Sequence, residues 1–458
     1  MNHDDPAATA APEHTELLQG WGLTAPSAGR VQRPVNAGEA RAALRDLPAR
    51  GVVARGLGRS YGDAAQNAGG RVVDMNLVDT LQIDNETGVV TAGAGVSIDT
   101  LIRVLVPRGW FVPVTPGTRY VTVGGAIAAD IHGKNHHVAG TWNQHVRSLR
   151  LLVPSGEVLD IGPETDPALF WATAGGLGLT GVVLDATFQC RPIETSRLSV
   201  ETIRAPDLDA IMDLMRDDVQ PYSVAWIDLM ARGAALGRSV LTRGDFARLD
   251  ELPGAQRGDP FTYDADILVG APPLVPGGLL NSLSIRAFNE LWFRKAPKHR
   301  DGELQTIPTF FHPLDMVGHW NRLYGPPGFV QWQVAVPFAA EATMRRVIER
   351  LSASGCTSFL AVLKTFGAGN DGPLSFPIAG WTLALDIPSG VAGLRPLLDE
   401  LDVEITEAGG RVYLAKDARV RADLLPAMYP RLDDWRAVRD RVDPEHRLQS
   451  DLGRRLGL

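Results

Sequence analysis

Three segments rich in glycine and other small residues, each lying between short apolar runs, constrain this chain most. They span residues 55–63, 116–132 and 175–181. Consecutive small residues let backbone N–H groups converge on an anion. Gly124-Gly125, at the start of an apolar helical stretch, predicts close approach of a pyrophosphate and free N–H donors for it. Three such loops in one domain are hard to explain as turns alone, so they predict a site for a phosphate-bearing cofactor.

The first of these segments does not fit the classical dinucleotide fingerprint. Its glycines, Gly56, Gly58 and Gly62, are spaced one residue too widely, and the chain continues through Ala68-Gly69-Gly70 into a strand-like run instead of a helix. A classical NAD site is therefore not expected. Taken alone, this segment favours a plain glycine turn over an anion site.

Length and composition narrow the class of protein. A chain of 458 residues with 45% hydrophobic and 21% charged residues predicts a soluble globular protein of two domains. The net charge of −8, without a basic block, argues against nucleic acid as a partner.

The chain has two cysteines, Cys190 and Cys356, whose spacing fits no metal site and whose number excludes a disulfide scaffold. Both are predicted to be buried. We see no signal peptide at the N-terminus, and the longer uncharged stretches are too interrupted by Gly and Pro for membrane spans.

The pattern of apolar residues divides the chain. We expect disorder over residues 1–15, then short strands alternating with helices up to about 195. There Asn36 and Glu39 have capping-box spacing for a helix running to about Leu47. After Arg191-Pro192 longer strand-like runs and amphipathic helices follow up to about 410, and a tail completes the chain.

The small-residue segments resemble a known family. Arg-Gly-x-Gly-Arg-Ser-Tyr-Gly-Asp at 55–63, Pro-Gly-Thr-x-x-Val-Thr-Val-Gly-Gly at 116–125 and Asp-Ile-His-Gly-Lys-Asn-His-His at 130–137 are similar to the FAD domain of the vanillyl-alcohol-oxidase, or PCMH-type, superfamily. The resemblance implies a two-domain α+β fold. A PCMH-type FAD-binding domain would span 16–195. A separate substrate-binding domain, built on an antiparallel sheet with helices, would span 196–410, and residues 411–458 would return to the FAD domain.

Later blocks, including residues 312–316 and 413–417, resemble the branch of this superfamily that acts on decaprenylphosphoryl-β-D-ribose. This implies an FAD-dependent oxidoreductase acting on a CH–OH group. It would oxidise the ribose 2-hydroxyl to the 2-keto sugar, the first half of epimerisation to the arabinose donor for cell-wall arabinan. The implied partners are the prenylphosphoryl sugar, an NAD(P)H-dependent keto-reductase subunit, and a quinone or other electron acceptor.

Two other functions stay open on the sequence. One is an aldonolactone or alditol oxidase of the same superfamily, although the His-Trp-Gly-Lys-type motif typical of those enzymes is absent. The other is a redox-silent flavoprotein that serves as a scaffold for the reductase.

The resemblance assigns the FAD contacts to residues of the first two loops and to two later positions. These are Ala54, Arg55, Gly56, Leu57, Gly58, Arg59, Ser60, Tyr61, Gly62, Asp63, Gly117, Thr122, Val123, Gly124, Gly125, Ala129, Asp130, Ile131, His132, Val183 and Tyr413. In many relatives a histidine that bonds covalently to the flavin stands where this chain has Arg59. We therefore expect non-covalent FAD, with attachment through His132 as the less favoured alternative.

Lys416, His132 and Tyr61 are the catalytic candidates. A lysine at this position can bind the substrate hydroxyl or phosphate or, if desolvated, accept a proton, whereas a surface ion pair with Asp417 is the alternative. The substrate candidates combine positive charge for a phosphate with an aromatic ring and amides for a sugar. They are Lys134, Trp226, Gln331, Gln333, Lys364 and Lys416. Solvated lysines and a packed core tryptophan are the competing interpretations.

Three further expectations concern the surroundings of this site. His132 and His136 are four residues apart, but Gly133 interrupts a helix and no carboxylate completes a cluster, so no metal is predicted. Phe311 and Ala384 replace a Tyr and a Cys of relatives. Two apolar loops, 270–278 and 308–329, predict a mobile mouth for a prenyl chain at a membrane surface, with ordinary disordered loops as the alternative. The sequence alone indicates a cytoplasmic protein, and the resemblance leaves a periplasmic face open.

Overall fold

The computed structural model describes residues 9–267, 269–272, 281–355, 358 and 360–458. Residues 1–8, part of the segment predicted to be disordered, lie outside the described residues, as do Cys356 and most of the predicted loop 270–278. Strand β1 (His14–Leu18) already begins inside the segment predicted to be disordered, because it pairs antiparallel with β2 (Ser27–Gln32). Cys190 is buried as predicted.

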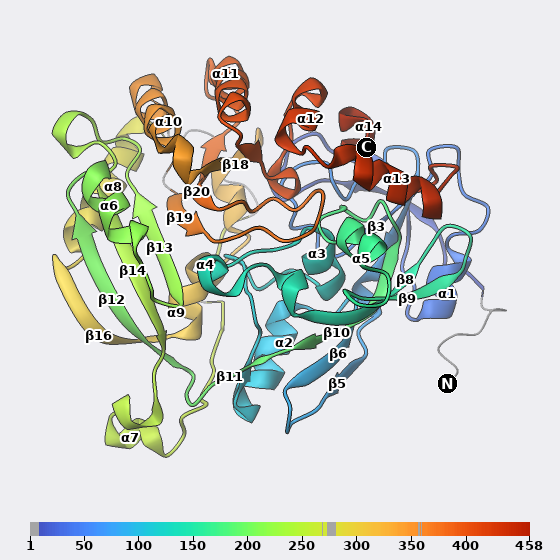
Figure 1. Ribbon diagram of the computed structural model, residues 1–458, viewed down its shortest axis with the longest axis horizontal. Coiled ribbons are helices and arrows are strands. Elements are labelled where there is room, and N and C mark those ends of the chain that lie inside the picture. The colour runs from blue at the N-terminus through green and yellow to red at the C-terminus, as the bar shows by residue number, and fades with distance from the viewer. Residues whose placement is uncertain (1–8, 268, 273–280, 356–357, 359) are drawn as a thin grey trace.

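Two sheets occupy the N-terminal part of the chain (Figure 1). A mixed four-stranded sheet has the order β1-β2-β4-β3, with β3 (Val52–Arg55) and β4 (Arg71–Asp74). An antiparallel five-stranded sheet has the order β5-β6-β10-β8-β9. Its strands are β5 (Leu81–Ile83), β6 (Val89–Gly93), β8 (Val146–Leu152), β9 (Val158–Ile161) and β10 (Val182–Gln189). The helices are α1 (Ala37–Ala42), α2 (Ile98–Leu105), α3 (Val123–Ala128), α4 (His136–Ala139) and α5 (Pro167–Thr173).

Helix α1 is shorter than predicted. Its N-cap, Asn36, accepts from the Glu39 backbone N–H at 2.9 Å as expected, but the helix ends at Ala42 instead of near Leu47. The Arg71 guanidinium donates to the carbonyls of Ala43 and Arg45 at 2.9 and 2.7 Å. This side chain therefore satisfies the terminal carbonyls that a longer helix would have bonded internally.

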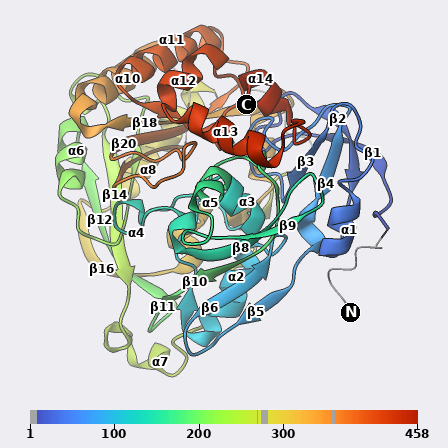
Figure 2. The same ribbon diagram turned by 45° about the vertical axis from the view of Figure 1, so that its right-hand side comes forward.

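The second part of the chain is built on one antiparallel sheet of eight strands, in the order β16-β12-β14-β13-β19-β20-β18-β21. The strands are β12 (Arg197–Ala205), β13 (Tyr222–Ile227), β14 (Ser239–Phe246), β16 (His299–Thr306), β18 (Phe329–Pro337), β19 (Ala361–Phe366), β20 (Gly380–Pro388) and β21 (Arg411–Val412). Helices α6 (Leu208–Arg216), α10 (Glu341–Ser354) and α11 (Leu394–Glu407) cover its outer face (Figures 1 and 2). The predicted antiparallel sheet with helices is confirmed.

The strand period of two separates the faces of this sheet. Ala225, Leu363 and Leu383 belong to the hydrophobic cluster beneath the helices. Their alternate neighbours, including Trp226 and Lys364, face a cavity on the opposite side. The sheet is thus the wall that carries the predicted substrate residues.

The predicted loop 308–329 is largely helical. Helix α9 (Ile307–Phe311) begins at the N-cap Thr306, whose hydroxyl accepts from the Thr309 N–H at 3.3 Å, and has Pro308 in its first turn. Short 3-10 helices follow at Pro313–Met316 and Trp320–Tyr324. Buried Phe310, Phe311, Trp320 and Tyr324 anchor the segment, so the expectation of a mobile or disordered loop was wrong here. The prediction failed because short helices held by aromatic packing leave little periodic signal.

The remaining strands and helices are β7 (Trp110–Phe111), β11 (Arg191–Pro192), β15 (Val269–Gly270), β17 (Val317–Gly318), α7 (Gly254–Arg257), α8 (Ser282–Lys295), α12 (Leu425–Met428), α13 (Leu432–Val442) and α14 (Asp451–Leu456).

The last two helices, α13 and α14, lie beside the N-terminal sheet (Figure 2), and the Gln449 N–H donates to the Val52 carbonyl at 2.8 Å. The chain end thus returns to the first sheet. Among the described helices, none combines the length and apolarity needed to cross a membrane.

An ion pair network fixes this return. Arg455 of α14 lies 2.8 Å from an Asp63 carboxylate oxygen and 2.9 Å from one of Asp417. Asp63 ends the first glycine segment, and Asp417 follows Lys416. One guanidinium therefore clamps two loops that are more than 350 residues apart in sequence.

Replacing Arg455 by Met should lower the free energy of unfolding by about 3 kcal/mol, because it leaves the buried Asp417 carboxylate without its cation. Denaturant unfolding, together with the flavin content of the purified protein, measures this. The matched control is Arg421→Met, which removes a fully exposed ion pair with Asp423 and should leave the unfolding midpoint nearly unchanged. Equal effects of both substitutions would contradict the clamp.

Candidate active site

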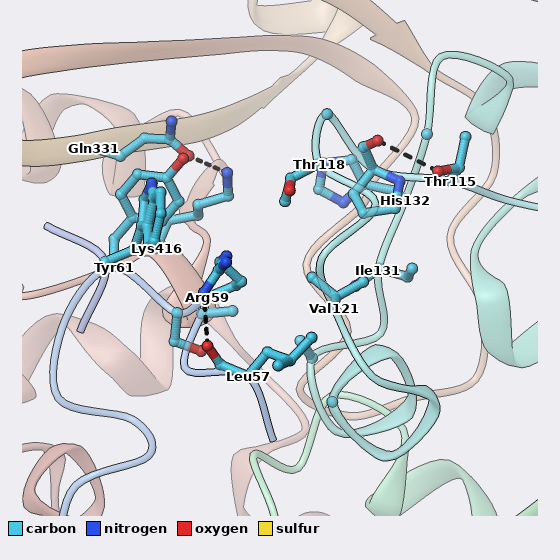
Figure 3. A pocket seen from close by; sticks show the side chains of 18 of the residues that line it. Leu57, Arg59, Tyr61, Thr115, Thr118, Val121, Ile131, His132, Gln331 and Lys416 are labelled. Carbon is cyan, nitrogen blue, oxygen red and sulfur yellow. Dashed lines mark hydrogen bonds between the residues drawn. The ribbon is translucent and has the colours of Figure 1, made fainter. Parts of the chain in front are cut away.

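A cavity of about 630 Å³ lies between the small-residue loops and the inner face of the eight-stranded sheet. Its size falls within the range typical of cofactor and ligand sites, roughly 300–1,000 Å³. Residues of all three predicted loops contribute to its lining, as do six strands of the sheet. Figure 3 shows Gln331, Tyr61 and Lys416 on one side of this opening, and His132 and Thr118 on the other.

Most of the predicted site residues line this cavity. They are Ala54, Arg55, Gly56, Leu57, Gly58, Arg59, Ser60, Tyr61, Gly117, Thr122, Gly124, Gly125, Ala129, Ile131, His132, Lys134, Val183, Trp226, Gln331, Gln333, Lys364, Tyr413 and Lys416. Four predicted cofactor residues, Gly62, Asp63, Val123 and Asp130, do not line it. Val123 is fully buried in the core, and Asp63 faces Arg455.

Gly62 and Asp130 shape the cavity from behind its wall. A Cβ at Gly62 would lie 2.0 Å from the Asp417 carbonyl oxygen, so only glycine lets the two loops touch. Asp130, which has a left-handed backbone, accepts hydrogen bonds from the side chains of Asn143, Asn370 and Ser375 at 2.7, 2.7 and 2.6 Å. It therefore joins the second loop to the connection between β19 and β20.

The first loop is braced by its own arginines. Arg55 donates to the carbonyls of Ala65 and Gln19 at 2.8 and 2.9 Å. Arg59 donates to the Leu57 carbonyl at 2.8 Å, and its guanidinium carbon lies 4.1 Å from the ring centre of Trp21. The loop is therefore preformed. Arg59 lines the cavity where many superfamily members carry the histidine that bonds to the flavin.

The second loop corrects one expectation. The N–H groups at the start of α3, predicted to be free for a pyrophosphate, have internal acceptors: Val123 and Gly124 donate to the Val96 and Ala94 carbonyls at 2.9 Å, and Gly125 to the Thr122 hydroxyl at 3.1 Å. Gly124 instead allows close packing, because a Cβ at this position would lie 3.0 Å from the Cβ of Ala94. The helix start supports the wall through packing and does not offer these N–H groups to an anion.

The cavity retains room for a planar cofactor because its glycines leave space open. A Cβ added at Gly117 or Gly178 would meet no atom within 4 Å, and both residues line the cavity. The apolar side chains of Val121, Ile131 and Val183 add flat, uncharged surface. This small-residue cradle fits the elongated FAD molecule that the sequence motifs predict.

Three lysines share the far end of this cavity. Lys416 donates from Nζ to Gln331 Oε1, and its Nζ lies 4.5 Å from the ring centre of Tyr61. Burial lowers its pKa to about 8, an effect that the charge of Asp386 partly offsets. Burial and the neighbouring Lys416 lower the pKa of Lys364 to about 7. Burial and the charge of Lys364 lower the pKa of Lys134 to about 7, and the Lys134 ammonium donates to the Phe310 carbonyl. The surface ion pair considered for Lys416 is excluded, because Asp417 pairs with Arg455.

His132 sits in an aromatic enclosure formed by Phe366, Phe376 and Tyr413, with ring centres 4.8–5.6 Å away. The side-chain amide nitrogen of Gln333 lies within hydrogen-bond distance of His132 Nε2, at 2.9 Å. Burial, followed by the charge of Lys364, holds the pKa of His132 well below its usual value. The side chain is therefore a neutral imidazole.

Several lining residues were missed from the sequence. Trp21 and Trp292 lie outside the quoted motifs, whereas Thr118 belongs to the motif at 116–125 but was not assigned a role. Val240 and Thr242 of β14 and Val362 of β19 could have been found from strand alternation, because they share a sheet face with Trp226 and Lys364. Phe311 and Ala384, the two departures from relatives, both line the cavity. Within the described part of the chain, no cluster of three His, Cys, Asp or Glu side chains is placed to hold a metal.

Comparison with known proteins agrees with this geometry. Residues 28–162 match the FAD binding domain family. The chain is 45% identical over 99% of its length to the whole of decaprenylphosphoryl-beta-D-ribose oxidase from Mycolicibacterium smegmatis. It is 25% identical over 86% of its length to 77% of a putative D-arabinono-1,4-lactone oxidase from Neurospora crassa.

A solved structure confirms the fold class. The Physcomitrella patens protein BBE-like 1 superimposes over 92% of this chain and 90% of its own, with a TM-score of 0.63 at 14% identity. The likeness establishes the shared two-domain architecture. Together with the sequence match, it shows that the chain is an FAD-dependent oxidoreductase and belongs to the family of decaprenylphosphoryl-β-D-ribose oxidases.

Proposed function

We propose that this enzyme oxidises the ribose 2-hydroxyl of decaprenylphosphoryl-β-D-ribose to the 2-keto sugar. The observation that carries the proposal is the cluster of Lys134, Lys364 and Lys416 at the end of a cavity lined by the FAD loops. Buried ammonium groups need an anion, and a prenylphosphoryl sugar supplies a phosphate next to an oxidisable hydroxyl. The matched relative bears the name of this activity.

The proposed roles follow from placement. FAD, when bound, accepts the hydride that leaves the sugar carbon. Lys134 and Lys364 hold the phosphate, and Trp226, Gln331 and Gln333 present a ring and two amides to the sugar. Lys416, with its lowered pKa, takes the proton of the reacting hydroxyl. His132, held neutral, and Tyr61 border the same position.

We further assign residues 16–195 and 411–458 to the FAD domain and 196–410 to the substrate domain. FAD is held without a covalent bond in this proposal, because the Arg59 guanidinium cannot form the usual histidyl link. The keto product needs an NAD(P)H-dependent reductase partner to complete the epimerisation, and the reduced enzyme needs a quinone or similar acceptor.

Substitution of Lys416 by Ala should slow anaerobic flavin reduction by prenylphosphoryl ribose at least about 100-fold, the usual contribution of a positioned base. Stopped-flow absorbance of the flavin gives the rate. Lys295→Ala, on exposed α8, is the control and should be indistinguishable from wild type.

The same assay discriminates the functions. Bleaching by free alditols or aldonolactones in preference to the prenylphosphoryl sugar would favour the lactone-oxidase alternative. No bleaching by any sugar, with tight reductase binding, would favour the redox-silent scaffold.

Phosphate binding should weaken as pH rises through about 7, where free Lys134 and Lys364 lose their protons. Below that pH both are already charged, so affinity for a short-chain prenylphosphoryl ribose, a phosphodiester with no proton to lose near neutral pH, is flat. Above it, binding must take up a proton, and Kd should rise by roughly tenfold per pH unit for each lysine that titrates. Flavin fluorescence reports binding.

The matched variant for this test is Lys364→Met, which should bind more weakly and show a shallower pH dependence. A wild-type Kd that is constant across this pH range would contradict the phosphate role of the two lysines.

We also propose peripheral membrane contact through α8. Its Leu283, Leu291 and Trp292 are 77%, 68% and 45% exposed, and Trp292 also lines the cavity. The charged residues that line a second groove, at the C-terminal end of this helix, are Arg204, Arg238, Glu290, Arg294 and Lys298, and Glu290 pairs with Arg238 and Arg294. Exposed apolar side chains beside cationic ones are typical of a helix that rests on anionic lipid.

Replacing both Leu283 and Leu291 by Ser should reduce binding to phosphatidylglycerol vesicles by roughly tenfold or more, since each buried leucine is worth more than 1 kcal/mol. Co-sedimentation measures the bound fraction. The control is Val219→Ser, an exposed apolar residue on the connection between α6 and β13. Equal losses in both variants, or concentration-dependent self-association in place of lipid binding, would contradict this surface.

A further inference from the structure

Asp386 is a fully buried carboxylate on the same face of the sheet as the cavity-lining residues Gln331 and Ala384. It lies on β20 directly opposite Gln331 of β18 in the sheet register. The side-chain amide nitrogen of Gln331 donates to its Oδ1 at 2.5 Å, and the amide oxygen of the same Gln331 accepts from Lys416. The carboxylate and the ammonium are thus joined through one amide group.

Burial raises the pKa of the Asp386 carboxyl to about 7, an effect that the Gln331 hydrogen bond and the charge of Lys416 partly offset. When Asp386 is ionised and Lys416 is an ammonium, the chemistry of the three groups allows one orientation of this amide. An ionised carboxylate only accepts hydrogen bonds, and an ammonium only donates them. The Gln331 NH₂ must therefore face Asp386, which leaves its carbonyl oxygen for Lys416. In a flipped Gln331 amide, the amide oxygen would face the Asp386 carboxylate, and the NH₂ group would face the Lys416 ammonium, so neither pair could form a hydrogen bond.

Other charged and titratable groups near the Lys416–Gln331–Asp386 hydrogen bonds do not stabilise the charge of Lys416. Lys364 disfavours the charged form of its neighbours, including His132. Tyr324 and Tyr61 face Asp386, and burial raises both phenol pKa values well above the usual range, so they stay neutral. Asp386 is the one anion whose charge acts on Lys416 among the described residues.

We propose that Asp386 is a positioning residue that acts through Gln331 to hold the ammonium of Lys416 in place and to favour its protonated form. Its catalytic meaning rests on the proposed function, because Lys416 must be neutral to receive the substrate proton and Asp386 would then stabilise the ammonium that forms. The contact network itself does not depend on the identity of the substrate.

The test reads the titration of Lys416 without any substrate. The FAD-loaded enzyme is acetylated with trace acetic anhydride across a range of pH, and peptide mass spectrometry gives the labelling of each lysine. In Asp386→Asn the titration midpoint of Lys416 should fall by roughly one pH unit, as loss of a nearby opposite charge predicts. The exposed Lys295 is the internal control and should not move.

Two further variants keep the proposal falsifiable. Gln331→Met leaves the carboxylate in place but removes the bridge, so the Lys416 midpoint should again fall. The double variant Asp386→Asn with Gln331→Glu returns a carboxylate to the ammonium and should restore the midpoint. Flavin content and thermal unfolding verify that each variant is folded.

An unchanged Lys416 midpoint in both Asp386→Asn and Gln331→Met would overturn the proposal, as would a double variant that fails to restore it. If the labelling result is as expected but no prenylphosphoryl sugar bleaches the flavin, the positioning role stands and the proposed substrate is wrong. In the opposite case the substrate stands and the role of Asp386 is lost.

Discussion

The burial of positive charge on the inner face of the eight-stranded sheet is the constraint on which the site depends. Lys364 and Lys416 sit in a low-dielectric cavity where their charged forms are penalised, and both have pKa values below the usual one. A fold tolerates such a cost where function requires it. The sheet holds Lys364 rigidly because the neighbouring strands fix its register, and Gln331 of the same sheet accepts a hydrogen bond from Lys416, so the positive charge is aimed at one point before any ligand arrives.

Two long-range contacts hold the FAD loops against the eight-stranded sheet and the segments next to it. Arg455 joins the first FAD loop to the segment that carries Lys416, and Asp130 joins the second loop to the connection after β19. Both contacts link residues hundreds of positions apart. The cofactor side and the substrate side of the cavity are therefore one mechanical unit, and the C-terminal return of the chain is part of the active site.

The sequence predicted the elements whose signals are local. The three small-residue loops, the cap at Asn36 and the antiparallel sheet with helices were all confirmed. The failures have long-range causes. Beyond the end of helix α1, Arg71 bonds the carbonyls of Ala43 and Arg45, and the N–H groups of Val123 and Gly124 donate to the carbonyls of Val96 and Ala94. Asp386 carries no motif at all, and only the register of β18 and β20 shows that it faces Gln331.

The three lysines are not equivalent, and the difference explains how one cavity can both bind an anion and remove a proton. Lys134 donates to a backbone carbonyl, so only a bound anion can restore its full charge near neutral pH. Lys416 has a carboxylate behind it, which compensates part of its burial without a ligand. The charge of Lys364 lowers the pKa of Lys134. An anion bound beside these two lysines therefore favours the protonated form of both Lys134 and Lys364. Phosphate binding thus relieves the repulsion at one end of the cluster, while the proton balance at Lys416 remains a property of the sheet.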